Sequence, residues 1–114
     1  MKFQNLNQYS EWKSYENSAG QAISSGGSYT FTINDITLYK MIYFEVGYFN
    51  TRSTPNSTII LTSCLNRGLD IYQGGDGDSS KQRRLTLTKV SNTQLKLTAY
   101  DCSVTVYKII GIKL

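Results

Sequence analysis

Histidine is absent from this 114-residue chain. Because histidine is the commonest general base and the commonest metal ligand in proteins, its absence argues against most catalytic and metal sites. A cysteine nucleophile would also need a base, and neither Cys64 nor Cys102 has a histidine to use. Glu45 alternates with the apolar Phe44 and Val46, so its carboxylate is expected to face solvent. The sequence therefore predicts a protein that is not an enzyme and needs no cofactor.

Cysteines and long apolar runs are also scarce. Two cysteines are too few for a disulfide framework. Cys64 and Cys102 could pair if their strands were neighbours, but free, partly buried thiols are the favoured interpretation. No stretch of 18 apolar residues occurs, so no helix is expected to span a membrane. The opening segment MKFQNLNQYS lacks the apolar centre of a signal peptide, and export by that route is not expected.

The segment GGDGDSS at residues 74–80 resembles a calcium loop in one respect only. Asp76 and Asp78 have the two-residue spacing of hard oxygen ligands. The sixth position of such a loop would be Lys81 instead of glycine, and the twelfth would be Leu87 instead of glutamate. Since glycine and aspartate are also the residues that flexible β-connections use, we predict a turn and no metal site.

The positive charge of the chain is modest and scattered. The formal net charge is +4, and the twelve lysines and arginines are spread from Lys2 to Lys113. Their only close cluster is KQRR at residues 81–84. A nucleic-acid-binding protein usually concentrates its charge on one face beside stacking aromatic rings. Solubilising charge is therefore the favoured interpretation, and a nucleic-acid partner is not expected.

An alternation of apolar and polar residues dominates the chain after residue 28 and predicts an all-β protein. In YTFTI, for example, Tyr29, Phe31 and Ile33 share one face. The residues before that point are ambiguous, because YSEWKSYENSA could form one or two helical turns or an opening strand; we favour the strand. No linker divides the chain, so one domain is expected over residues 1–114. The strands are expected at about residues 12–16, 29–33, 40–49, 57–63, 69–72, 83–89, 94–99 and 103–114.

The connections between these strands are unequal. In an antiparallel meander or Greek key, successive connections alternate between the two ends of the sheet. One end then receives the longer connections, rich in Gly, Ser, Asn and Asp, at residues 17–28, 50–56 and 73–82. The opposite end receives the shorter connections and also the start of the first strand and the finish of the last. This arrangement suits a domain that is mounted at one end and makes contacts at the other.

The long connections supply the candidate binding residues. Planar polar side chains beside aromatic rings can bind sugars, because hydroxyl groups exchange hydrogen bonds with Asp, Asn and Arg while an apolar sugar face packs on a ring. The alternative interpretation is that loops simply contain such residues. The predicted ligand site consists of Tyr48, Asn50, Arg52, Asn56, Tyr72, Gln73, Asp76 and Asp78.

The order of features resembles a recurrent C-terminal domain of phage and prophage tail fibres. The resemblance is carried by Trp12, by the Gly- and Ser-rich stretch before YTFTINDITLYKMIYFEVGYFN, and by the closing VTVYKIIGIKL. It implies an antiparallel, jelly-roll-like β-sandwich of about eight strands at the end of a tail fibre or tail-tip protein. It also implies a homo-oligomer, often a trimer, that sometimes binds host surface glycans. Residues 1–11 would then be a poorly ordered or stem-connecting segment, and the protein would act outside the cell as part of the virion tail.

The closing segment SVTVYKIIGIKL has apolar residues on both faces. If the alternation holds, Val104, Val106, Ile110, Ile112 and Leu114 share one face, and Tyr107 and Ile109 the other. A strand of this kind lies in the centre of a sheet, or its second face meets another subunit. Gly111 interrupts the run and is expected at a bulge or at a close approach of the backbone.

Three functions remain open on the sequence alone. The first is a non-enzymatic receptor-binding or structural domain of a phage-type tail fibre that contacts host glycans. The second is a stand-alone carbohydrate-binding module of a bacterial surface or secreted protein. The third is a basic nucleic-acid-binding β-barrel, for which Arg83 and Arg84 would need aromatic neighbours on an open face.

Overall fold

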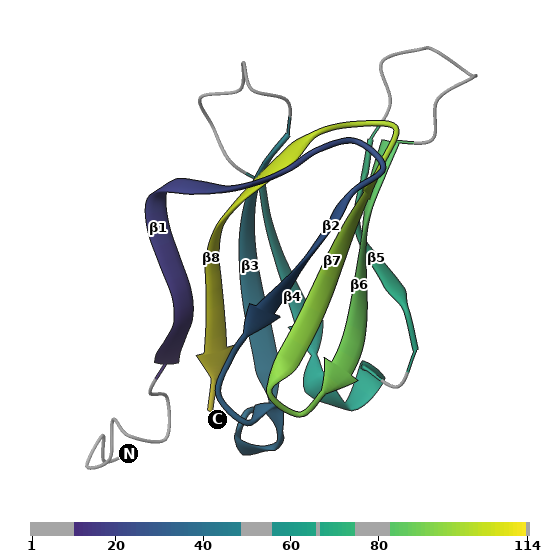
Figure 1. The fold of residues 1–114 in the computed structure, drawn as a ribbon. Helices are drawn as coiled ribbons and strands as arrows, with labels where there is room; N and C mark the ends of the chain where they lie inside the picture. The colour runs from purple at the N-terminus through teal and green to yellow at the C-terminus, as the bar shows by residue number, and fades with distance from the viewer. Residues whose placement is uncertain (1–10, 49–55, 66, 75–82, 114) are drawn as a thin grey trace.

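The protein is an antiparallel β-sandwich of two four-stranded sheets (Figure 1). The computed structural model describes residues 11–48, 56–65, 67–74 and 83–113, with the side chains of residues 11–19, 48 and 72–74 left undescribed. The predicted sandwich class is therefore confirmed. In spatial order, the first sheet contains β1 (Glu11–Ile23), β8 (Val104–Ile112), β3 (Met41–Tyr48) and β4 (Asn56–Leu61). The second contains β2 (Ser28–Thr32), β7 (Gln94–Tyr100), β6 (Arg83–Ser91) and β5 (Leu69–Gly74).

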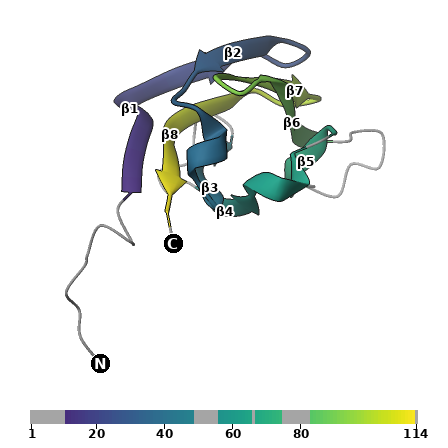
Figure 2. The ribbon, with the colours of Figure 1, turned by 90° about the horizontal axis from the view of Figure 1, so that it is seen from below.

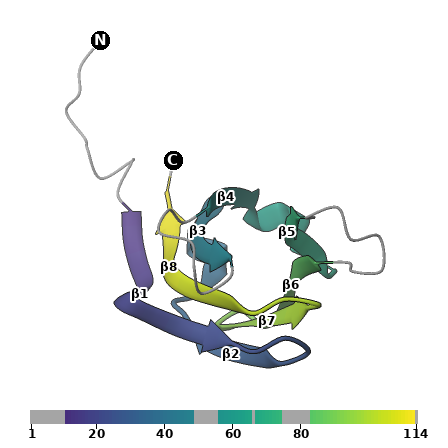
Figure 3. The same ribbon diagram turned by 90° about the horizontal axis from the view of Figure 1, so that it is seen from above.

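The two sheets form opposite walls of the molecule when it is viewed along the strands (Figures 2 and 3). On one side the walls meet where β4 lies beside β5. No backbone ladder joins these two edge strands. Instead, the Thr58 hydroxyl of β4 donates a hydrogen bond of 3.0 Å to the carbonyl of Ile71 in β5. A side-chain bond therefore links the two edges on this side.

A folded ribbon joins the two sheets on the other side. The first strand pairs with the last, β1 with β8, and the second with the seventh, β2 with β7. At the corner between the sheets, Gly26 N–H donates to the Ala99 carbonyl at 2.8 Å, and Ala99 N–H donates to the Gly27 carbonyl at 2.9 Å. In a jelly roll all eight strands pair in this order, the first with the last and the second with the second-last, continuing inward. Here β1, β2, β7 and β8 follow that order, while β3 pairs with β4 and β5 with β6 as hairpins.

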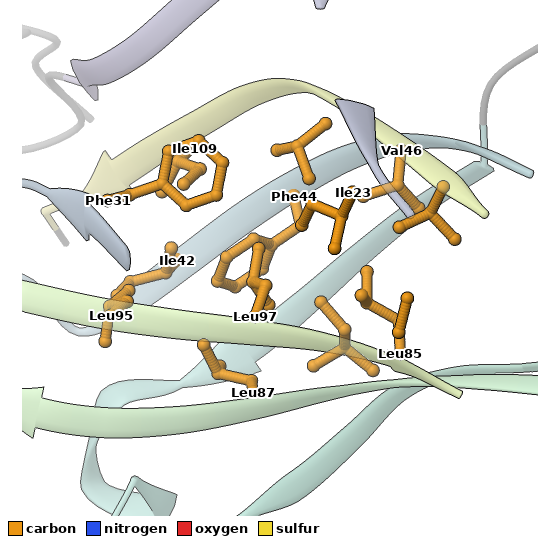
Figure 4. Packing of buried hydrophobic residues seen from close by; sticks show 14 of the residues in the cluster. Ile23, Phe31, Ile42, Phe44, Val46, Leu85, Leu87, Leu95, Leu97 and Ile109 are labelled. Carbon is orange, nitrogen blue, oxygen red and sulfur yellow. The ribbon is translucent and has the colours of Figure 1, made fainter. Parts of the chain in front are cut away.

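The core lies between the sheets and follows the predicted alternation closely (Figure 4). Leu85, Leu87, Leu95 and Leu97 are fully buried, as their period of two requires. The strand expected at residues 40–49 is β3, and its nearly continuous apolar sequence lies inside the sheet, between β8 and β4. The other members of the core cluster are Ile23, Phe31, Ile33, Ile36, Ile42, Phe44, Val46, Leu65, Ile71, Ala99, Cys102, Val104, Val106 and Ile109.

The first connection is much shorter than predicted. Residues 17–23 belong to β1, so the expected loop at 17–28 shrinks to residues 24–27. The prediction failed because NSAGQAI shows no apolar alternation. Its pairing with β8 is irregular: Glu16 is aligned with Lys108 and Gln21 with Val106, so four residues of β1 lie opposite one of β8. A bulge of this kind removes the sequence signal of a strand.

The predicted face assignment in β8 is wrong beyond residue 106. Val46 and Glu45 of β3 are aligned with Val106 and Lys108, so Tyr107 is an extra, bulged residue. A one-residue slip exchanges the two faces of a strand. As a result Ile109 joins Val104 and Val106 in the core, whereas Ile110 and Ile112 face outward. Leu114 lies outside the described residues.

One end of the sandwich carries the start of β1 and the finish of β8, because Glu11 is aligned with Ile112. We call it the base. Two short 3₁₀ helices close it, η2 (Ile36–Leu38) and η3 (Thr62–Cys64). Their connections are tied to the sheets: Lys40 N–H donates to the Ile112 carbonyl at 2.9 Å, and the Thr62 hydroxyl donates to the Tyr39 carbonyl at 2.6 Å.

Asp35 fixes the start of η2. Its carboxylate accepts hydrogen bonds from the Thr37 hydroxyl at 2.7 Å and from the Thr37 N–H at 2.9 Å. These bonds favour the charged form and lower the pKa of Asp35 below its ordinary value. The segment NDIT is thus a capped turn, and it holds Ile36 in the core.

Candidate functional site

The end opposite the base, which we call the loop end, is where residues 24–27 and 101–103 connect strands. β3 and β5 also finish at this end, and β6 begins here, because Tyr48 is aligned with Val104 and Gly74 with Arg83 (Figure 1). The connections at 49–55 and 75–82 lie outside the described residues. The strand ends therefore alternate between the two ends as predicted, and the first of the three predicted long connections is short.

The predicted site residues fall into three groups. Asn50, Arg52, Asp76 and Asp78 lie outside the described residues. Tyr48, Tyr72 and Gln73 lie near the finish of β3 and β5, with undescribed side chains. Asn56 is half-buried at the start of β4, aligned with Val46. Tyr48 and Asn56 thus belong to one sheet, and Tyr72 and Gln73 to the other.

A row of three residues crosses the second sheet at the loop end. Gln73 of β5 is aligned with Arg84 of β6, which is aligned with Tyr100 of β7. The Arg84 guanidinium carbon lies 4.4 Å from the centroid of the Tyr100 ring, which is a cation–π contact. Tyr100 keeps 39% of its surface exposed. This row, which we call the Arg84 row, presents an aromatic ring and a planar cation together on the outer surface.

The neighbouring Arg83 points the opposite way. It shares the inward face with Leu85 and is only 9% exposed. It lies close enough to Cys102 for its charge to affect that thiol. Burial raises the pKa of Cys102, and the positive charge of Arg83 opposes this only in part. An open basic face would need both arginines on the surface, so this burial weakens the nucleic-acid hypothesis.

The two cysteines are free, as predicted. Cys102 is buried beside the loop end, while Cys64 is exposed in η3 at the base, so it is not the partly buried thiol that was expected. Because they lie at opposite ends of the sandwich, they are too far apart for the Cα spacing of a disulfide.

The sequence named Arg84 only as a candidate nucleic-acid contact, and it did not single out Tyr100. A signal for their shared face was present: the inward-facing Leu85 and Ala99 imply that the neighbouring Arg84 and Tyr100 point outward. The predicted glycan contacts omitted both residues because they were drawn from the loops. Only their cross-strand alignment, which the β6–β7 hairpin sets, brings them together.

The chemistry that this end can support is recognition. A partly exposed tyrosine ring can pack against an apolar sugar face, and a guanidinium can donate to hydroxyl or carboxylate groups. Among the described residues, no group of three or more side chains could hold a metal ion. Within the same residues, no helix has the length and apolar character needed to cross a membrane.

Comparisons with protein-family models, curated proteins and solved structures find no match to this chain. The tail-fibre resemblance therefore rests on the residues quoted for it, and function must be argued from the geometry of the molecule.

Proposed function

We propose that this chain is a non-enzymatic receptor-binding domain at the end of a phage-type tail fibre and that it binds host surface glycans through its loop end. The domain would be joined to its fibre at the base. In such a fibre it would form a homo-oligomer, a trimer as the resemblance implies, and would act on the virion outside the cell.

The observation that carries this proposal is the polarity of the sandwich. The strand ends at Glu11 and Ile112 are aligned at the base. The Arg84 row and the strand ends at Tyr48 and Gly74 belong to the opposite end. Attachment at one end leaves the other free for a ligand, and binding residues are commonly carried on loops above a rigid scaffold.

The second candidate is a stand-alone carbohydrate-binding module, and the Arg84 row favours it equally. The two functions differ in the number of chains that act together. A fibre end should have the mass of three chains in solution, whereas a carbohydrate-binding module should have the mass of one. Light scattering over a dilution series separates them.

Glycan binding itself is tested by substituting the Arg84 row. The wild-type chain is applied to an array of bacterial surface glycans, and the dissociation constant of the best-retained glycan is measured by calorimetry. Tyr100→Ala removes the stacking surface and Arg84→Gln removes the cation. Each should weaken binding about tenfold, which corresponds to about 1.4 kcal/mol. Lys96→Gln is the matched control, because Lys96 is exposed on the same face of β7 away from the row.

A second pair of substitutions tests the 73–82 connection. Asp76→Asn combined with Asp78→Asn should abolish binding if this connection holds the ligand, and unchanged affinity would remove both residues from the site. The proposal fails if no glycan is retained, or if Tyr100→Ala and Arg84→Gln bind as tightly as Lys96→Gln.

A further inference from the structure

The outer surface of the β1–β8–β3–β4 sheet carries six apolar side chains in two cross-strand rows. Leu61, Met41 and Ile112 are aligned across β4, β3 and β8. Ile59, Tyr43 and Ile110 form the adjacent row on the same strands. Ile59 is 56% exposed and Leu61 is 52% exposed, while Met41, Tyr43 and Ile112 are half-buried and Ile110 is only 7% exposed at the floor of the surface. We call these six residues the apolar face.

Two central rows on the outer surface of the other sheet are polar and provide an internal comparison. Thr30 of β2 is aligned with Lys96 of β7, and Lys96 with Thr88 of β6. In the next row, Thr98 is aligned with Thr86, whose hydroxyl donates to the Asp70 carboxylate at 2.7 Å. Two sheets of one domain thus differ in what they expose. A contiguous, partly exposed apolar surface of this kind marks an interaction site.

A row of opposite charges lies directly beside the apolar face. Glu45 of β3 is aligned with Lys108 of β8, and their side chains approach to 3.9 Å. The Tyr43 hydroxyl donates to the same Glu45 carboxylate at 3.0 Å. Burial, together with this carboxylate, raises the pKa of Tyr43 and keeps its ring neutral. The sheet therefore carries, beside the apolar face, one negative and one positive group aligned on neighbouring strands.

From this arrangement we infer that the apolar face packs against the same face of a second copy of this chain. The two copies can be related by a rotation axis that runs parallel to the strands in front of β3 and β8. Such a rotation does not shift any residue along the strand direction. It brings the β3 side of one copy against the β8 side of the next. Glu45 then meets the other copy's Lys108, Tyr43 meets Ile110, and Met41 meets Ile112, so the surface complements itself in charge and in polarity.

The size of the face limits the strength of this contact. Three strands about 4.8 Å apart, each with about four residues at about 3.3 Å, present roughly 200 Å². A standard stable interface buries about 800 Å² per partner. Contact through this face alone should therefore depend on protein concentration. The inference does not require glycan binding and would survive its failure.

The first test places charge on the most exposed part of the face. Light scattering over a dilution series should show mass rising above one chain for the wild type. Ile59→Lys combined with Leu61→Lys should remain at the mass of one chain throughout. The matched control is Val90→Lys, because Val90 is 53% exposed on a strand of the other sheet; it should associate like the wild type. Equal melting temperatures would show that each variant is folded.

The second test separates contact between copies from contact within one. Glu45→Lys and Lys108→Glu each place like charges opposite one another, so each variant alone should associate at least tenfold more weakly than the wild type. A mixture of the two variants should associate more strongly than either alone, since each supplies the charge that the other lacks. A monomeric wild type at every concentration, or a mixture no stronger than its components, would overturn the inference.

Discussion

Gly111 lies beneath the ring of Tyr39, which is why this position in β8 has no side chain. A Cβ added here would lie 2.8 Å from Cγ and Cδ2 of that ring. Tyr39 cannot move away easily, since its carbonyl accepts from Thr62 and the N–H of Lys40 donates to Ile112. The close approach predicted from the sequence is confirmed, whereas the bulge lies at Tyr107.

Gly111→Ala should therefore lower the free energy of unfolding by about 1–3 kcal/mol, the usual effect of overpacking. Gly68→Ala is the control, because a Cβ there has no neighbour closer than 3.7 Å. Urea denaturation measures both. If Gly111→Ala is as stable as Gly68→Ala, the ring of Tyr39 does not constrain this position.

The two thiols should differ in reactivity and in their effect on stability. Cys64 is exposed and Cys102 only 3% exposed, so a disulfide reagent should modify one thiol quickly in the folded protein and the second only on unfolding. Since burial raises the folded-state pKa of Cys102, the unfolded chain loses this proton first as pH rises past 9.0.

Stability should consequently fall above that pH, and the fall should be smaller in Cys102→Ala. Urea titrations between pH 7 and pH 10 measure the free energy of unfolding of the two proteins. The lysines and tyrosines that titrate in the same range contribute equally to both, so the difference between the proteins reports on Cys102. Parallel curves would contradict the role given to Cys102, as would rapid modification of both thiols in the native protein.

At the scale of elements, the β5 edge shows how an irregular strand can close a sandwich. Asp70 is aligned with Thr86 and Tyr72 with Leu85, which leaves Ile71 as an extra residue outside the ladder. Its carbonyl accepts from Thr58 of β4 instead. The bulge thus turns a backbone acceptor toward the other sheet.

Thr58→Val keeps the shape of the side chain but removes the donor, and should lower the free energy of unfolding by about 1–2 kcal/mol. Thr58→Ser keeps the hydroxyl and should retain more of this stability. Urea denaturation of the two variants measures the difference. The hydrogen bond would contribute nothing to closure if valine proved at least as stable as serine.

The same elements show what a sequence can and cannot predict. Regular alternation located β2, β6 and β7 within a residue or two, since each has one buried face, and a nearly continuous apolar run located β3 equally well. The bulges at Tyr107 and between Glu16 and Gln21 could not be predicted from the alternation. An inserted residue reverses the two faces of a strand, and it is recognised only when the alignment with the partner strand is known. The candidate site was found in part: its end of the molecule was predicted, but the pairing of Arg84 with Tyr100 depends on cross-strand register.

At the scale of the whole molecule, the sandwich owes its two unlike ends to the order of its strands. An even number of antiparallel strands returns the chain to the end from which it started. The base therefore carries Glu11 and Ile112 together, and its connections are short and held by hydrogen bonds at Lys40 and Thr62. In the proposed function the loop end is the end that binds the ligand, and the apolar face of one sheet lies between the two ends.

The place of β8 in its sheet has a consequence for biosynthesis. The ribosome makes β8 after the other seven strands, yet it lies between β1 and β3. Until it emerges, those two strands have open edges of the kind that favour pairing with other chains. The pairing of β1 with β8 joins residues from nearly opposite ends of the sequence, so it loses much loop-closure entropy and can form only after β8 is made. Folding should therefore be slow. A chain interrupted before residue 104 would lack the strand that joins β1 to the rest of its sheet, and would be a substrate for chaperones and proteases.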